Sequence, residues 1–189
     1  MARLFSKTQS ANPPSERDLL NNKYQSARSV FLLVVALTVV NMVMAVVGED
    51  TYFLFSIFIP YFLTFLGAML CGKMPEEYYV GENAIEPYES SGIMWVLVAI
   101  SAIIVIAAAV LWLISKKPST IKMIVMLAFF ALDTVLMLLI SGIDLTMILD
   151  YVMHAYIIYA LITGISAAAK LKALPQESPV APDDSFIAP

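Results

Sequence analysis

Of the 189 residues of this chain, 60% are hydrophobic and only 14% are charged, whereas soluble domains carry about 25% charged residues. This composition excludes an ordinary soluble domain and makes the lipid bilayer the expected surroundings of most side chains. The formal net charge is −4, but its sign matters less than its distribution, because basic and acidic residues fall in different connections between apolar segments.

Five continuous apolar runs follow one another along the chain, each 19 to 22 residues long, which as helix matches the roughly 30 Å hydrocarbon core of a bilayer. Their continuity excludes a barrel of alternating strands. The first run lacks a small-residue cleavage site at its end, so we interpret it as a retained anchor rather than a signal peptide. The sequence therefore predicts an all-α polytopic membrane bundle of five helices over residues 29–47, 51–71, 93–114, 121–140 and 145–166.

Two tails flank the predicted membrane domain of residues 29–172. Residues 1–28 are basic and are expected to be cytoplasmic and partly disordered. A helix is expected from Glu16, because Ser15 and an aspartate three residues later have the spacing of a capping box. That helix would be either an interfacial amphipathic segment or an extension of the first membrane helix. Residues 173–189 are rich in proline and acids and are expected to be disordered.

The second run offers two possible courses through the membrane. Five full crossings would leave six Lys and Arg residues on the cytoplasmic side and five outside, whereas a re-entrant second run would leave only Lys73 outside. Short cytoplasmic loops favour Lys and Arg, so the charges support re-entry. Pro60 lies mid-run and could break or kink the helix there. We favour a crossing kinked at Pro60, because few other helices are present to wrap a re-entrant hairpin.

Three polar residues are predicted to lie near the bilayer midplane. Counting about 1.5 Å per residue from each helix end places Asn41 and Asp133 about 18 Å deep and His154 about 13 Å deep. An acid such as Asp133 at the centre of a span costs roughly 2.5 to 3.5 kcal/mol and needs a partner or a purpose. Asp150 and His154 are four residues apart and share a helix face.

These residues allow several interpretations, which the sequence leaves open. In the structural one, Asn41 hydrogen bonds to Asp133 and His154 to Asp150. Alternatively the group forms a proton or cation path, or supplies metal ligands, although two ligands do not make a metal site. An intramembrane enzyme with paired acids would require Asp133 and Asp150 to be adjacent.

Small residues are spaced for close helix packing on two predicted helices. Ala160, Gly164 and Ala168 form a small-xxx-small row on the last helix, and Gly67 belongs to a comparable patch on the second. Such residues let helix backbones approach closely in lipid. We expect them to pack helices within one chain or between subunits.

Three stretches resemble small, uncharacterised multi-spanning membrane proteins of bacteria. They are Tyr52–Tyr61 (YFLFSIFIPY), Phe129–Asp133 (FFALD), and Asp150–His154 (DYVMH) running on to Lys170–Pro175 (KLKALP). The resemblance implies location in a bacterial cytoplasmic membrane and no particular activity.

The sequence favours a non-enzymatic function. No connection is long enough to fold as a catalytic domain, and there is no Gly-rich phosphate loop, Cys cluster or Gly-x-Ser-x-Gly motif. We expect an integral membrane component that packs with itself or another membrane protein, without cofactor, metal or nucleic-acid partner. The alternative is a small transporter or channel-like protein that moves protons or cations through the midplane polar residues.

Overall fold

The computed structural model describes residues 14–81, 86–88 and 91–175. The disorder expected for most of the two tails falls on residues 1–13 and 176–189, outside the described residues. Every regular element in the described ranges is a helix, as the all-α prediction required. The elements are α1 (Glu16–Val46), α2 (Phe58–Leu70), the 3₁₀ turn η1 (Glu76–Tyr79), α3 (Gly92–Ile114), α4 (Thr120–Ser141), the 3₁₀ turn η2 (Leu145–Met147) and α5 (Ile148–Ala173).

Four helices, α1, α3, α4 and α5, are long and apolar enough to cross a membrane. The fifth, α2, has 13 residues and would extend only about 20 Å, short of a roughly 30 Å hydrocarbon core. The prediction of five membrane helices is therefore wrong for the run over residues 51–71. Its first part, residues 51–57, is not helical.

The second run returns to the end of the bundle from which it started. Gly48, which has a φ of +89° in the turn after α1, is packed so tightly on the carbonyl group of Lys73 that a Cβ there would collide with it. Residues just before and just after the run therefore touch. The run turns back within the bundle, and we call it the re-entrant segment for that reason; a second helix that spans the bundle with a kink at Pro60 is not what the structure has.

Pro60 begins a helix instead of kinking one. It is the third residue of α2, whose N-cap is Ile57. The backbone amides of a first helical turn have no partner within the helix, so a proline there removes no hydrogen bond. The break in the run thus lies just before the proline, where the extended segment meets α2.

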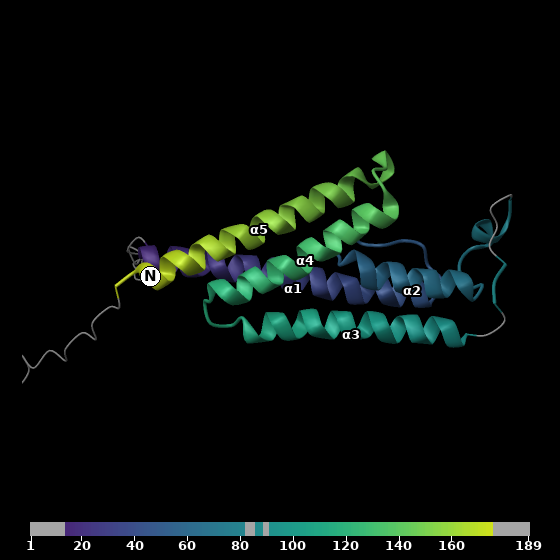
Figure 1. The fold of residues 1–189 in the computed structure, drawn as a ribbon, viewed down its shortest axis with the longest axis horizontal. Coiled ribbons are helices and arrows are strands. Elements are labelled where there is room, and N and C mark those ends of the chain that lie inside the picture. The colour runs from purple at the N-terminus through teal and green to yellow at the C-terminus, as the bar shows by residue number, and fades with distance from the viewer. Residues whose placement is uncertain (1–13, 82–85, 89–90, 176–189) are drawn as a thin grey trace, which may run out of the picture.

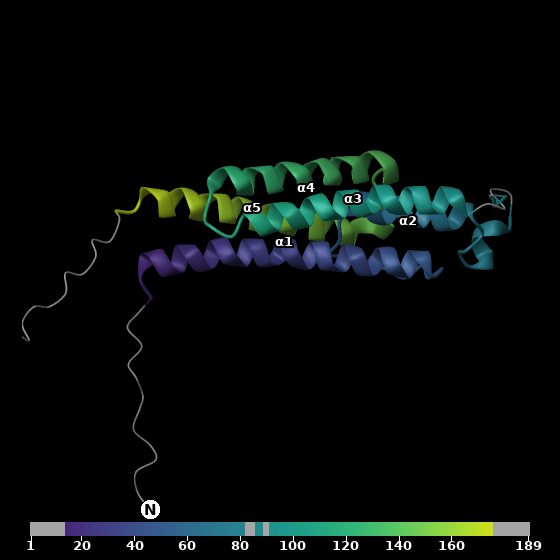
Figure 2. The ribbon, with the colours of Figure 1, turned by 90° about the horizontal axis from the view of Figure 1, so that it is seen from below.

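Figure 1 shows the long helices aligned along one axis, with α2 confined to half of the bundle. In the view of Figure 2, α1 and α4 lie on opposite sides, with the other helices between them. The main packing pairs are α1 with α5, α2 with α3, and α4 with α5. Helix α2 packs on α3, α1 and α4, and the extended part contacts α5 through Tyr52 and Phe55, so the other helices provide partners for the whole segment.

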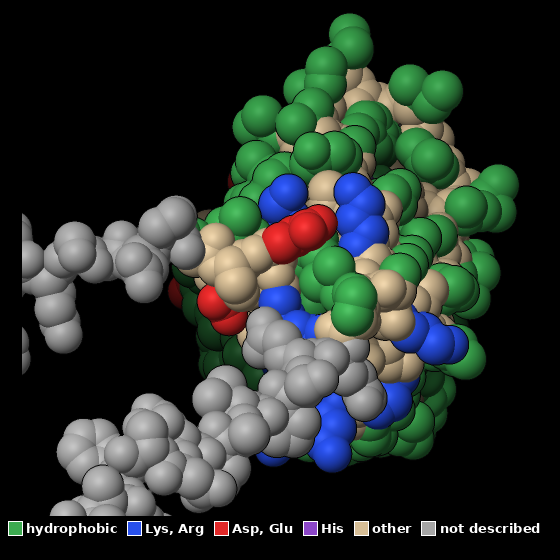
Figure 3. Space-filling view, turned by 90° about the vertical axis from the view of Figure 1, so that its left-hand side faces the viewer, with side chains coloured by type: hydrophobic (Ala, Val, Ile, Leu, Met, Phe, Trp, Pro, Cys, Tyr) green, Lys and Arg blue, Asp and Glu red, His purple; other side chains and the backbone are tan. Residues whose placement is uncertain are grey.

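One end of the bundle, here called the basic end, combines the start of α1, the α3–α4 connection and the end of α5. Figure 3 looks onto this end, where Lys and Arg side chains gather. The Tyr24 hydroxyl of α1 donates to the carbonyl oxygen of Ser115 at 2.7 Å, and Arg17 donates to that of Pro175 at 2.7 Å. The opposite, acidic end carries Glu49, Asp50, η1 and the α4–α5 connection.

Helix α1 begins at Glu16 with the expected capping box between Ser15 and Asp18. It continues without interruption to Val46. Of the two alternatives for this segment, the structure thus has an extension of the first membrane helix.

The predicted small-residue rows pack helices of the same chain. A Cβ on Gly164 would collide with Ala27 of α1 and Met123 of α4, and Ala160 and Ala168 beside it are buried. A Cβ on Gly67 would lie 3.1 Å from the Met94 Cα of α3. Both rows therefore serve packing within the bundle.

Candidate functional site

The carboxylate of Asp133 binds the N-terminus of α2 inside the bundle. Oδ2 accepts the backbone N–H of Phe58 and Oδ1 that of Ile59, each at 2.9 Å. Asp133 is only 4% exposed. A carboxylate placed on free first-turn amides is favoured both by the charge-assisted hydrogen bonds and by the positive end of the helix dipole.

Helix α2 needs this external cap because of its own sequence. Its N-cap, Ile57, offers no side-chain hydrogen bond. In lipid or protein interior, no bulk water is available to satisfy the exposed amides of a helix that starts there. Asp133 of α4 therefore takes the place that a Ser, Thr or Asp N-cap residue has in most helices.

Two polar residues of α1 hold the extended segment that leads into α2. The Asn41 amide group donates to the carbonyl oxygen of Phe53 at 2.8 Å and accepts the N–H of Phe53 at 2.7 Å. The Thr38 hydroxyl accepts the N–H of Ile57 at 2.8 Å and donates to Val34 of its own helix at 2.7 Å. Extended backbone inside a bundle requires such partners, since it makes no internal ladder of hydrogen bonds.

Asp150 of α5 holds the start of the same segment. Its Oδ2 accepts the hydroxyl of Tyr52 at 2.6 Å. The Tyr52 ring in turn stacks on Tyr61 of α2, with ring centroids 5.1 Å apart. Three of the long apolar helices, α1, α4 and α5, thus each contribute polar groups to the segment that contains α2. We call Thr38, Asn41, Asp133 and Asp150 together the clamp.

His154 lies beside the clamp and is 2% exposed. Its Nδ1 is 3.0 Å from the backbone oxygen of Asp150. A carbonyl oxygen can only accept, so Nδ1 carries a hydrogen. Nε2 lies 3.5 Å from Oδ2 of Asp133 and has no hydrogen-bond partner. A hydrogen bond between Nε2 and Oδ2 would require a hydrogen on one of these two atoms. The His154 ring also stacks on the Phe130 ring, at a centroid distance of 5.0 Å.

The structure brings together only part of the predicted site. Asp133 and His154 are neighbours, consistent with the prediction that both lie near the bilayer midplane. Asn41, however, bonds to Phe53 and not to Asp133, and His154 reaches the backbone of Asp150 rather than its carboxylate. The predicted Asn41–Asp133 bond is therefore wrong, and the predicted His154–Asp150 bond is present but uses the backbone oxygen, since most side-chain hydrogen bonds are made to backbone or water.

Sequence reasoning missed Thr38 and Tyr52. Thr38 lies three residues before Asn41 and therefore on the same helix face, which was a readable signal for a shared polar partner. Tyr52 carried no comparable signal, because a tyrosine near a predicted membrane boundary is ordinarily an interfacial residue.

The chemistry open to this arrangement is narrow. Within the described ranges, no three His, Cys, Asp or Glu side chains are grouped to hold a metal ion. Asp133 binds the amides of α2 while Asp150 binds Tyr52, so the two carboxylates have separate partners. What the site offers is a set of hydrogen bonds to backbone and one contact between the His154 and Asp133 side chains.

Comparisons of this chain with protein-family models, with curated proteins and with solved structures found no match.

Proposed function

We propose that this chain is a non-enzymatic integral membrane component that packs in the bilayer with itself or with another membrane protein. The observation that carries the proposal is that both oxygens of Asp133 are used by the amides of Phe58 and Ile59. A buried acid with this role stabilises a particular backbone course. It leaves no oxygen that is free of protein contacts for a substrate.

The positions of the cavities support the same function. A cavity of about 640 Å³ lies at the basic end, and grooves of about 360 and 330 Å³ follow α1 beside α5 and α3. None of the three is lined by Asp133, Asp150 or His154. Substrate sites in proteins are normally concave pockets with convergent polar groups, and here the cavities and the clamp are separate.

The orientation we propose follows from the charges. Lys and Arg gather at the basic end and only Lys73, of the described basic residues, lies at the other. Basic residues in short loops favour the cytoplasmic side. We therefore assign the basic end, with the N-terminus of α1, to the cytoplasm, and the chain to a bacterial cytoplasmic membrane in line with the resemblance of its sequence.

Reconstitution tests the proposal. Liposomes containing the wild-type chain, Asp133→Asn or no protein would be given a pH gradient and then a K⁺ gradient. The proposed function predicts equal ion flux in all three and a less stable variant. Proton or cation flux by the wild type that Asp133→Asn abolishes while it stays folded would overturn it. The mass of the wild-type particle in nanodiscs, measured by light scattering, would report self-association.

A second candidate, movement of protons or cations, is favoured by one specific observation. Nε2 of His154 is buried without a hydrogen bond and faces Asp133. His154 and Asp133 form a short series of polar side chains, whereas the link from His154 to Asp150 is made through the Asp150 backbone oxygen. Intramembrane acids and histidines in such series commonly relay protons. Flux that rises on acidification and is lost in His154→Gln would support this candidate; unchanged flux in that variant would remove it.

A further inference from the structure

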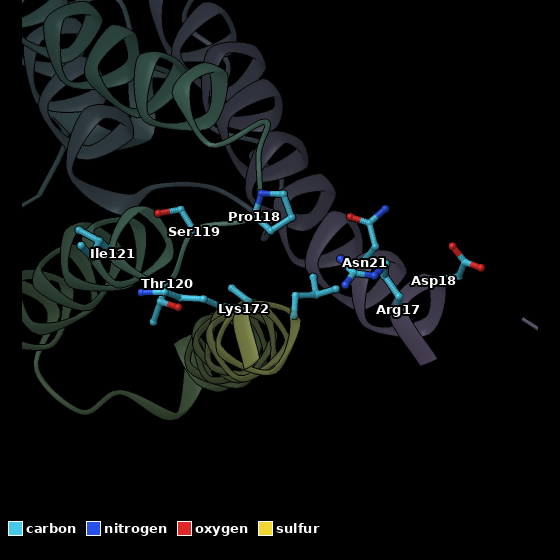
Figure 4. A pocket seen from close by; sticks show the side chains of 10 residues that line it. Arg17, Asp18, Asn21, Pro118, Ser119, Thr120, Ile121 and Lys172 are labelled. Carbon is cyan, nitrogen blue, oxygen red and sulfur yellow. The ribbon is translucent and has the colours of Figure 1, made fainter. Parts of the chain in front are cut away.

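The cavity of about 640 Å³ at the basic end lies between α1, α4 and α5. Figure 4 shows Arg17 and Asn21 on α1, facing Ser119 and Thr120 across the opening, with Lys172 of α5 between them. The volume is within the range of about 300 to 1,000 Å³ typical of small-molecule sites. It is therefore large enough to hold a headgroup with the first part of an attached chain.

Two cations and one acid line the cavity. Arg17 uses one terminal nitrogen on the Pro175 carbonyl oxygen, which leaves other donors of its five free for a ligand. Lys172 is exposed. The acid, Asp18, accepts hydrogen bonds from the hydroxyl and backbone N–H of Ser15 at 2.8 and 3.3 Å. Figure 4 shows Asp18 on the far side of Arg17 from Ser119 and Thr120, and two of the three charged side chains that line the cavity are cations.

The start of α4 adds donors to the same cavity. Ser119 and Thr120 line it, and Ser119, the N-cap, makes no side-chain cap. First-turn amides and the positive end of a helix dipole attract anions. This contribution supplements the two cations, which come from different helices.

The remaining wall is apolar and continues into exposed apolar surface on α4. Ile121 is 75% exposed, and Ala168 and Leu171 lie near it in the same lining. Ile124 and Val125 continue the exposed apolar surface along α4. A ligand that fills the whole cavity therefore has an anionic part and an apolar part, in the order that a phospholipid presents them at a membrane interface.

We propose that this cavity binds the headgroup of an anionic phospholipid. The phosphate group lies between Arg17 and Lys172 at the start of α4, and an acyl chain passes Ile121 along the surface of α4. A free phosphate ion would use the cationic part alone and leave the apolar wall empty. The proposal is independent of the function proposed above, since it involves none of the clamp residues.

Native mass spectrometry of the full chain, released from nanodiscs, tests the proposal. Titration with phosphatidylglycerol would compare the wild type with an Arg17→Gln/Lys172→Gln variant. The matched control is Lys116→Gln/Lys117→Gln, which removes the same charge from exposed residues at the same end that do not line the cavity. We expect the cavity variant to bind about tenfold more weakly or worse, because two charge-assisted contacts are lost, and the control to change less than twofold.

Each other outcome overturns the inference. Equal losses in the two variants would mean diffuse attraction to the basic end. Equal binding of phosphatidylcholine would remove the need for an anionic headgroup, and displacement of the lipid by millimolar inorganic phosphate would indicate a site for the free ion. Single Arg17→Gln and Lys172→Gln variants, each with a thermal unfolding curve, keep the test decisive if the double variant is unstable.

Discussion

The carboxylate oxygen Oδ1 of Asp133 lies 2.9 Å from the backbone nitrogen of Ile59, a residue 74 positions earlier in the chain. This contact joins α4 to the first turn of a helix that begins inside the bundle. It explains how one acid can be retained in a membrane span at an insertion cost of roughly 2.5 to 3.5 kcal/mol. Without the carboxylate, two buried backbone N–H groups would have no acceptor, and this would cost free energy of comparable size.

Asp133 variants should lose stability in proportion to the acceptors removed. Asp133→Asn keeps one oxygen and should lower the free energy of unfolding by about 1 to 3 kcal/mol, whereas Asp133→Leu removes both acceptors and should cost more than about 3 kcal/mol. Equilibrium unfolding in mixed SDS micelles measures both. Thr134→Val is the control, because the Thr134 hydroxyl bonds only within its own helix, to Phe130. Equal effects of Asn and Leu would contradict the capping role.

Thr38 tests the extended segment at a single hydrogen bond, because its hydroxyl oxygen accepts the backbone N–H of Ile57. Thr38→Val should leave that amide without an acceptor and cost about 1 to 3 kcal/mol, whereas Thr38→Ser keeps the hydroxyl and should be nearly neutral. Hydrogen exchange of the Ile57 amide should speed up in the Val variant alone. Similar exchange in both variants would show that the hydroxyl does not hold this backbone.

The course of the second run can be tested by labelling single cysteines in a Cys71→Ser background. Because Gly48 touches Lys73, Glu49→Cys and Lys73→Cys should react with a membrane-impermeant maleimide from the same side of the membrane. Lys117→Cys and Lys172→Cys should react from the other. If Glu49→Cys and Lys73→Cys were labelled from opposite sides, the run would cross fully and the re-entrant topology would be wrong.

Close packing of α5 on α1 and α4 depends on Gly164. A Cβ there would lie 2.7 Å from the Cβ of Ala27, so Gly164→Ala should force the helices apart and cost about 1 to 3 kcal/mol. The thermal unfolding midpoint in detergent measures the loss. Ala155→Leu on the exposed face of the same helix should leave the midpoint within a degree or two of the wild type. A smaller effect at Gly164 than at Ala155 would reject this packing role.

Much of the fold was predictable from local sequence. The length and apolarity of four runs identified α1, α3, α4 and α5, because a membrane span is selected mainly by its own composition. Counting depth also placed Asp133 and His154 at one level, where they meet at 3.5 Å. The hydrogen-bond partner of Asn41 was not predictable, since it is the backbone of Phe53, and a backbone group carries no sequence signal.

The sequence by itself determined that this chain is helical and apolar and that its basic residues are segregated, all of which depend on residue type and spacing. Only the tertiary structure decided the course of residues 51–71. An extended segment, and a short helix whose own sequence provides no cap, are stable inside a bundle only if other residues offer hydrogen-bond acceptors and donors to their backbone. Those groups come from Thr38, Asn41 and Asp133, which long-range folding brings to the break.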